Sequence, residues 1–465
     1  MGNNHPRIRK IVSALLFTVI LGTLISSSSH VLMLKRSKTK MKRFFDEQQN
    51  FDVLFTGLSH MQVGVFPMEL YGEYGLTAFN LGQAGETIPF AYWILRMALE
   101  YTTPKLVVIE TRRMDIEKKK LGDYVFPVWD YFPSDLLKLQ AAVDLERTFD
   151  LTASRWLETV KYHSRWEELS EEDFNLTYYW IDNGATHYAR SELDVVASPA
   201  EYPEIADDDA IAPTSLALKY LKKTIRLCQE RGIEVLLTEL PFPATEEEQR
   251  YANGVQKIAD KYGVRYLNYH HNRDVVNMKT DLSNETHLND SGARKISYDI
   301  GSFIKENYEL PDRRGEPGYE SWEEQYDEYR AFKNDRISRR KKFAVCLMLL
   351  HDRHINTYIR IREGSLPERW ERTLNLMKKI CAGGQHLEQF DDAVDSGAMY
   401  TAYIDNENGT VTEKTGGGEF TADVFGKTER LDSPEGDAAI ADTRYGVELR
   451  IFDAISGEEI AHFYY

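Results

Sequence analysis

The sequence FDVLFTGLSHM at residues 51–61 decides the fold of this chain. Residues 51–56 are a short, mainly apolar run rich in β-branched and aromatic residues, which predicts a buried strand, and Gly57 closes it with a tight turn. Ser59 therefore stands beyond the carboxyl end of a strand, where open α/β sheets place their ligands. A serine nucleophile also needs a base, usually histidine, and amide donors for an oxyanion.

The segments after this turn alternate between apolar runs and amphipathic stretches. Residues 105–111 form a continuous apolar run, which is typical of a strand in a parallel sheet that is buried on both faces. Further strands are predicted at residues 76–80, 233–240 and 264–268, and helices at residues 89–101, 213–231 and 245–262. Thr245 and Glu248 predict a capping box at the start of the last helix. This order predicts an α/β fold with a doubly wound parallel sheet.

The N-terminal region predicts a membrane anchor. Residues 11–34 contain no Asp, Glu, Lys or Arg, follow a basic flank at residues 1–10, and are long enough to span a bilayer. A cleaved signal peptide is the alternative, with the serines at residues 26–29 as its cleavage zone. We favour an uncleaved anchor because residues 31–34 extend the apolar segment. Residues 35–50 are interpreted as a basic, helical stalk that lies partly on anionic headgroups.

Three regions outside the sheet differ in composition. Residues 116–212 are rich in aromatic side chains and predict a mainly helical insertion, where one or two rings are candidates for stacking on sugars. Residues 311–340 form a linker with a charged helix, and residues 341–465 a separate, β-rich α+β domain. The elements predicted in this last domain are a strand at residues 343–350, a helix at 367–380, and hairpins at 400–413 and 447–465.

Composition excludes some function classes. The 465-residue chain has a net charge of -17, which argues against nucleic acid as a partner because phosphate binding needs a basic face. His270 and His271 lack further ligands at a metal-binding spacing, and we interpret them as loop histidines. His60 is expected to pack against the turn or cap it. The sequence therefore predicts neither a metal nor a cofactor.

Four motifs lie at the ends of predicted strands or before a predicted helix. They are GLSH (57–60), NLGQAGET (80–87), ETRRMD (110–115) and NETHLN (284–289). In this order they resemble the SGNH (GDSL-like) hydrolase and acyltransferase superfamily over residues 51–310. The resemblance implies a flavodoxin-like, three-layer fold with Ser59 as the nucleophile and His287 as the base. It also implies an oxyanion hole formed by the amides of Ser59 and Gly85, and the substrate-binding candidates are Asn80, Arg112 and Arg113.

Two motifs depart from the pattern of that superfamily. The third motif lacks the asparagine that the superfamily uses as a further oxyanion donor, and Arg112 or Arg113 is the candidate substitute. In the fourth motif Asn284 stands where the superfamily has an aspartate three residues before the histidine. An asparagine can orient an imidazole but does not stabilise an imidazolium as a carboxylate does. Asp281 is the alternative orienting residue.

The chain also resembles bacterial membrane-anchored members that add or remove acyl groups on surface polysaccharides, including the D-alanyl transfer protein of teichoic acid. The N-terminal span, the motif from Asp281 to His287-Leu-Asn289 and the phrase YHSRWEEL at residues 162–169 carry this resemblance. It implies an extracytoplasmic body, although the basic residues at 35–43 would by a positive-inside count keep the body in the cytosol. The tail from residue 341 contains GG at 383–384, AYID at 402–405 and RYGVELRIFD at 444–453. On these phrases it resembles the interleukin-like EMT inducer (ILEI) domain, a β-rich module with carbohydrate-related associations.

These resemblances lead to two functional hypotheses. The first is an anchored extracytoplasmic esterase or O-acyltransferase that acts on a cell-surface glycan through an acyl-serine. Its implied partners are a surface polysaccharide or a teichoic-acid-like polymer and a membrane-bound acyl carrier or transferase. The second is a catalytically reduced protein of the same fold that binds glycans or serves in their assembly.

Overall fold

The computed structural model describes residues 5–35, 38–47, 49–116, 126–149, 158–174, 201–278, 281–339, 343, 346, 352–365 and 387–465. The chain separates into two compact units. The first unit comprises Met1–Gln62, Leu76–Arg190 and Pro203–Asn272, and the second comprises Val63–Gly75, Ser191–Tyr202 and Arg273–Tyr465.

The first unit is built on a five-stranded parallel sheet. The strands are β1 (Val53–Thr56), β2 (Ala78–Asn80), β3 (Leu106–Glu110), β4 (Glu234–Glu239) and β5 (Arg265–Asn268). Their order is β2-β1-β3-β4-β5, and every neighbouring pair is parallel. This is the flavodoxin-like order, in which the direction of winding reverses between β1 and β3. The prediction of an α/β fold with a doubly wound sheet is confirmed.

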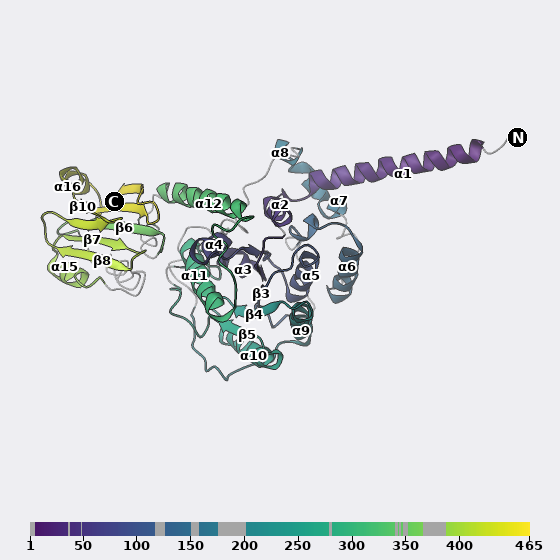
Figure 1. Cartoon of the computed structure of the whole chain (residues 1–465), viewed down its shortest axis with the longest axis horizontal. Helices are drawn as coiled ribbons and strands as arrows, with labels where there is room; N and C mark the ends of the chain where they lie inside the picture. Colours follow the sequence, from purple (N-terminus) through teal and green to yellow (C-terminus); the bar gives the residue numbers. More distant parts are fainter. Residues whose placement is uncertain are drawn as a thin grey trace. The chain divides into compact units, whose positions relative to one another are not determined.

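The helices that connect these strands begin and end within three residues of the predicted bounds. They are α5 (Ile88–Ala98), α9 (Ser215–Glu230) and α10 (Glu246–Tyr262), all visible around the sheet in Figure 1. The capping box of Thr245 and Glu248 is present, and Gly263 ends α10 in the left-handed region at φ 64°. Side-chain caps at Thr214 and Thr245 fix the starts of α9 and α10, and such local signals can be read from the sequence alone.

Helix α1 (His5–Leu32) contains the apolar segment, and α2 (Lys38–Asp46) follows it. The segment Ile8–Leu32 contains an 18-residue window with a mean hydropathy of 2.0 and is long and apolar enough to cross a membrane. The basic stalk predicted at residues 35–50 is corrected by the structure. Met41 and Phe44 of α2 are fully buried, so this helix packs into the first unit. The sequence analysis considered only the basic residues of this segment. Its apolar residues lie on one face of an amphipathic helix, and that face packs.

Between residues 126 and 174 the described part of the aromatic insertion is mainly helical, as predicted, whereas residues 201–212 form no helix. It contains η3 (Trp129–Tyr131), α6 (Leu136–Phe149), α7 (Glu158–Lys161), η5 (His163–Glu167) and α8 (Glu171–Phe174). Residues 117–125, 150–157 and 175–200 lie outside the described residues. The segment from α7 to α8 lies beside the C-terminal end of α1 (Figure 1).

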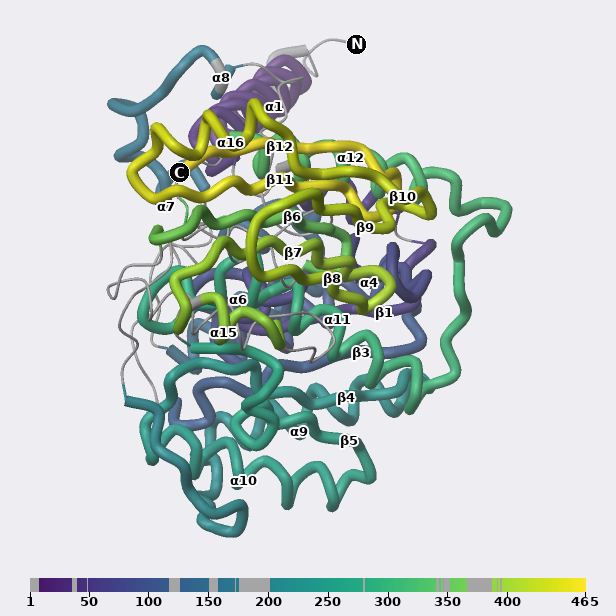
Figure 2. Tube along the Cα trace, turned by 90° about the vertical axis from the view of Figure 1, so that its left-hand side faces the viewer, coloured from purple at the N-terminus to yellow at the C-terminus, as the bar shows by residue number. Residues whose placement is uncertain are grey.

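The second unit combines helices with an antiparallel sheet. The helices are α4 (Pro67–Tyr74), α11 (Asp290–Asn307), α12 (Glu320–Ser338), α15 (Phe390–Ser396) and α16 (Pro434–Ala441). The main sheet has the order β12-β11-β6-β7-β8, which can be followed in Figure 2. Its strands are β6 (Ile355–Ile361), β7 (Tyr400–Asp405), β8 (Thr410–Thr415), β11 (Val447–Asp453) and β12 (Glu459–Tyr464). A smaller hairpin is formed by β9 (Thr421–Val424) and β10 (Lys427–Arg430).

Both hairpins predicted in the C-terminal region are confirmed, as β7–β8 and β11–β12. The strand predicted at residues 343–350 is wrong at the two positions that are described, because Phe343 and Cys346 are helical. Apolar runs of this length do not distinguish a strand from a buried helical segment. The helix predicted at residues 367–380 lies outside the described residues.

Candidate active site at the carboxyl end of the parallel sheet

Ser59 is the first residue of α3 (Ser59–Gly64) and follows β1 after a two-residue turn. The carboxylate of Glu110, the last residue of β3, holds this turn. Its Oε2 atom accepts hydrogen bonds from the amides of Leu58 at 2.7 Å and Met61 at 3.3 Å. The sequence analysis named Glu110 only as part of a motif. The signal in the sequence was that Glu110, an acidic residue, ends a strand whose other residues are all apolar.

Gly57 is required where β1 meets Glu110. A Cβ atom at position 57 would lie 2.5 Å from both the Cβ and the Oε2 atom of Glu110, much closer than such atoms approach in proteins. We therefore expect Gly57→Ala to displace the Glu110 carboxylate from the Leu58 and Met61 amides. The expected cost is roughly 1–3 kcal/mol in the free energy of unfolding. Urea denaturation of the full chain in detergent measures it, and an unchanged midpoint would contradict the close packing.

The loop after β2 is fastened to the Ser59 turn by Asn80. The Asn80 side chain is fully buried, its Nδ2 atom donates to the carbonyl of Met61 at 2.7 Å, and its Oδ1 atom accepts from the amide of Gly82 at 2.9 Å. Lys40 of α2 donates to the carbonyl of Gly82 at 2.7 Å. Gly85 has a φ of 65°, a conformation that favours glycine. Asn80 thus orders the glycine loop, and a substrate-binding role for it stays a prediction.

The histidine motif belongs to the second unit, in the loop before α11. The Oδ1 atom of Asn284 lies 3.1 Å from Nδ1 of His287 and also accepts from the His287 amide at 2.9 Å. The hydroxyl of Thr286 lies 3.2 Å from the same Nδ1 atom. An amide oxygen only accepts, so a hydrogen bond from His287 to Asn284 places the proton on Nδ1 and leaves Nε2 as the basic nitrogen. Asp281 is fully buried, and its Oδ2 atom accepts from the amide of Asn277 at 2.7 Å and from Lys295 at 2.8 Å.

The structure therefore assigns different partners to the two candidate orienting residues. Asn284 contacts the His287 ring, whereas the carboxylate of Asp281 pairs with Lys295. Ser59, Asn80 and Gly85 lie in the first unit, and His287, Asn284 and Asp281 lie in the second. The pairing of Ser59 with His287 is part of the proposal below.

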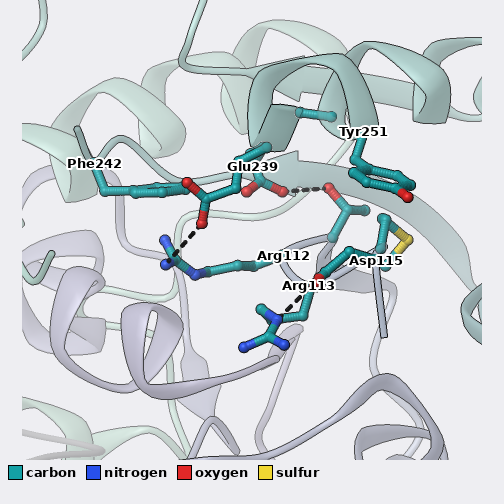
Figure 3. Close-up of a pocket in the computed structure, with 10 residues that line it drawn as sticks. Arg112, Arg113, Asp115, Glu239, Phe242 and Tyr251 are labelled. Carbon is teal, nitrogen blue, oxygen red and sulfur yellow. Dashed lines mark hydrogen bonds and ion pairs between the residues drawn. The ribbon is translucent and has the colours of Figure 1, made fainter. Parts of the chain in front are cut away.

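A narrow pocket opens beyond β3 and β4 in the first unit (Figure 3). The guanidinium carbon of Arg112 lies 3.5 Å from the centroid of the Phe242 ring, and one guanidinium nitrogen lies 3.7 Å from Glu248. Arg113 instead pairs with Asp115 at 2.9 Å. The free volume is about 20 Å³, which is space for one water-sized group. Of the two arginines, Arg112 is the one stacked on the pocket wall.

Two buried acids end the neighbouring strands β3 and β4: Glu110, and Glu239, which lines the pocket. Burial, together with the charge of Glu110, raises the pKa of Glu239 to about 8, against the opposing effect of Arg112. Burial also raises the pKa of Glu110 to about 7, although the Leu58 amide and Arg112 lower it. Thr111 donates to Glu239 at 2.9 Å. Both acids are therefore partly protonated near neutral pH.

The histidines near this pocket pack as the sequence predicts. The His60 ring meets the Phe242 ring edge to face at 5.4 Å. His270 and His271 follow β5 in a turn, and His271 pairs with Asp207 at 2.8 Å. Among the described residues, no three His, Cys, Asp or Glu side chains form a group that could hold a metal ion.

The raised pKa of Glu239 predicts a pH dependence of stability. An acid whose pKa is higher in the folded state contributes stability below its unfolded value of 4.5, and this is lost as pH rises through about 8. We expect Glu239→Gln to lose less stability between pH 5 and pH 8 than the wild type does. The difference should reach a few kcal/mol, at about 1.4 kcal/mol per pKa unit. Urea unfolding at several pH values measures both slopes, and equal slopes would contradict the assignment.

Comparisons with known proteins add little to this geometry. No family model matches the chain, and no curated protein matches it. A solved structure of a "putative acylhydrolase" from Bacteroides fragilis NCTC 9343 is similar to it, with a TM-score of 0.28 and 12% sequence identity. The match covers 57% of this chain and 96% of that one. At this level of similarity, the fold assignment rests on the strand order of the first unit.

Proposed function

We propose that this protein is a membrane-anchored, extracytoplasmic serine esterase or O-acyltransferase of SGNH type. The observation that carries the proposal is the position of Ser59. It begins α3 directly after β1, at the carboxyl edge of the sheet and beside the point where the winding reverses. Ligands of open α/β sheets bind at this point.

The proposed reaction has two steps with one covalent intermediate. The Ser59 hydroxyl attacks the ester carbonyl while Nε2 of His287 takes its proton, and the amides of Ser59 and Gly85 bind the resulting oxyanion. Collapse of the tetrahedral intermediate breaks the ester bond, and His287 returns the proton to the leaving alcohol. Water or an acceptor hydroxyl then attacks the acyl-serine by the same steps, which gives hydrolysis or transfer respectively.

Asn284 limits the rate that this arrangement can reach. It orients His287 through Nδ1 at 3.1 Å, but it carries no charge to stabilise the imidazolium that forms. The proposed enzyme is therefore slow by the standards of enzymes with a carboxylate in this place.

The proposed substrate is an acylated cell-surface glycan. Helix α1, used as an uncleaved anchor, would hold the first unit at the membrane surface, where such polymers are made and modified. The resemblance of the C-terminal region to the ILEI domain supports a carbohydrate partner. A membrane-bound acyl carrier or transferase is the proposed acyl donor.

A second candidate function is a glycan-binding or assembly protein with little catalysis. The same contact between Asn284 and His287 favours it, because a neutral partner weakens the base. Both candidates use the surface around Ser59, and they differ in whether that serine reacts.

A fluorophosphonate probe distinguishes the two candidates, because it forms a covalent bond only with an activated serine. We expect the purified full chain to be labelled and to hydrolyse a short acyl ester, and Ser59→Ala to lose both activities. Ser134→Ala is the matched control, since Ser134 is an exposed serine of the same unit. A folded wild type without labelling or turnover would exclude the esterase and favour the binding protein.

A further inference from the structure

The exposed part of α1 has the length of a bilayer interior. Every residue from Ile8 to Ser28 is exposed, and the packing of the helix against the first unit starts at Ser29. Arg9 and Lys10 are charged, so the exposed part that can lie in hydrocarbon is residues 11–28. At a rise of 1.5 Å per residue it is about 27 Å long, close to the ~30 Å thickness of the hydrocarbon layer. If α1 crosses a membrane, the bilayer surface therefore lies where the folded protein begins.

The segment 158–174, which comprises α7, η5 and α8 and is called the collar here, holds the end of α1 at this level. Ser29 and Thr159 are joined by a hydrogen bond of 3.0 Å between their hydroxyl groups. Arg165 donates to the carbonyls of Leu32 and Met33, the latter at 3.0 Å. A cation at the C-terminal end of a helix is stabilised by the helix dipole.

Buried ion pairs fix the collar in place. Asp173 pairs with Arg165 at 2.9 Å and with Lys35 at 3.8 Å, which links α8 to the chain just after α1. Tyr162 is buried and donates to Asp130 at 2.6 Å, and Lys161 pairs with the same carboxylate. The solvent-exposed side chains of the collar are therefore held at a fixed position along the axis of α1.

Three of these outward side chains are apolar and large. Trp166 is 67% exposed, Phe174 is 61% exposed and Val160 is 45% exposed. Tryptophan and other aromatic side chains are favoured at the headgroup level of membranes, where an apolar ring meets water. The collar thus presents an apolar surface at the height where the hydrocarbon layer ends.

We propose that the collar lies on the bilayer and inserts Trp166 and Phe174 into its interfacial layer. The occupant of this surface is phospholipid, because the surface continues the exposed face of α1. Exposed charges on the collar include the acidic residues Glu167, Glu168 and Glu171, so attraction to anionic lipids does not drive the contact. The contact fixes the orientation of the first unit on the membrane, independently of whether Ser59 is catalytic.

Quenching by brominated lipids tests the proposal on the full chain. The protein is reconstituted in phosphatidylcholine vesicles with bromine near the top of the acyl chains. Wild type is compared with Trp166→Phe, and the difference in tryptophan emission reports on Trp166 alone. In the Trp166→Phe background, Phe174→Trp places a new reporter on the collar, and Lys257→Trp places one on the exposed face of α10. Figures 1 and 2 show α10 at the end of the first unit opposite α1.

We expect bromine to remove most of the emission of Trp166 and of the new tryptophan at position 174. The tryptophan at position 257 should keep its emission. The loss should be the same when part of the lipid is anionic, because insertion is apolar. If bromine quenched the tryptophan at neither position 166 nor position 174, the proposal would be overturned, and a protein partner would be the remaining candidate to cover the collar. Quenching that needs anionic lipid would overturn its apolar basis.

Discussion

Ser59→Ala, His287→Ala and the double variant should lower ester turnover by the same factor, about a thousandfold or more. A nucleophile and its base depend on each other, so once the serine is removed, removing the histidine as well lowers turnover little further. Non-additive losses would support the proposed roles of Ser59 as nucleophile and His287 as its base. Steady-state hydrolysis of a short acyl ester by the full chain measures all four proteins.

The outcome that contradicts this pairing is a double variant whose losses multiply, because residues that act separately have additive free energies. Circular dichroism and the urea midpoint of each variant show whether the loss comes from unfolding. Ser134→Ala again serves as the control for an ordinary serine of the first unit.

Asn284→Asp should raise turnover, by about tenfold or more, because a carboxylate stabilises the imidazolium that an asparagine only orients. The change keeps an oxygen at the position that now accepts from the Nδ1 atom and the amide of His287. It should act on kcat more than on KM. Unchanged turnover in a folded variant would show that His287 is not the base.

Glu69→Ala should cost about 3–5 kcal/mol in the free energy of unfolding of the second unit, because it removes one partner of a buried ionic network. Glu69 of α4 is fully buried. Its Oε2 atom lies 2.9 Å from the Tyr298 hydroxyl and 3.0 Å from Nδ1 of His354, and its Oε1 atom accepts from Tyr329. Removing the carboxylate would leave the buried imidazolium of His354 without the negative charge of Glu69.

The same network predicts a pH range of maximal effect. Burial alone would raise the pKa of Glu69, but Lys333 and His354 outweigh it and hold that pKa well below 4.5. Burial would lower the pKa of His354, but Glu69 and Glu73 raise it to about 9 from 6.5. The contribution of Glu69 is present above pH 4.5 and lost on acidification, whereas that of His354 is full below pH 6.5 and lost as pH rises through 9. The network is therefore most stabilising between these limits.

Urea unfolding between pH 4 and pH 10 measures this, with emission of the buried Trp322 as a reporter within the second unit. Glu69→Gln is the isosteric comparison, since it keeps the size of the side chain and removes the charge. We expect its destabilisation to be largest near pH 5–6 and to shrink towards both extremes. A difference from wild type that does not vary with pH would contradict the charged network.

The sequence by itself determined the elements whose signals are local. The apolar runs at 105–111 and 233–240 and the turn at Gly57 gave the strands of the parallel sheet, and Thr245 with Glu248 gave the start of α10. It also placed Ser59 at the end of β1. Periodicity, caps and turn residues act over a few neighbouring positions, so one sequence is sufficient to show them.

Only the tertiary structure decided which distant side chains meet. It placed Glu110 under the amides of Leu58 and Met61, and it gave His287 the partner Asn284 while Asp281 went to Lys295. It also joined Glu69 to His354, which is 285 positions later in the chain. Glu110, Asp281, Glu69 and His354 are buried, whereas Asn284 is exposed. Burying a polar group costs free energy unless it finds a partner. Which partner it finds depends on packing across the fold, and no local pattern in the sequence records that choice.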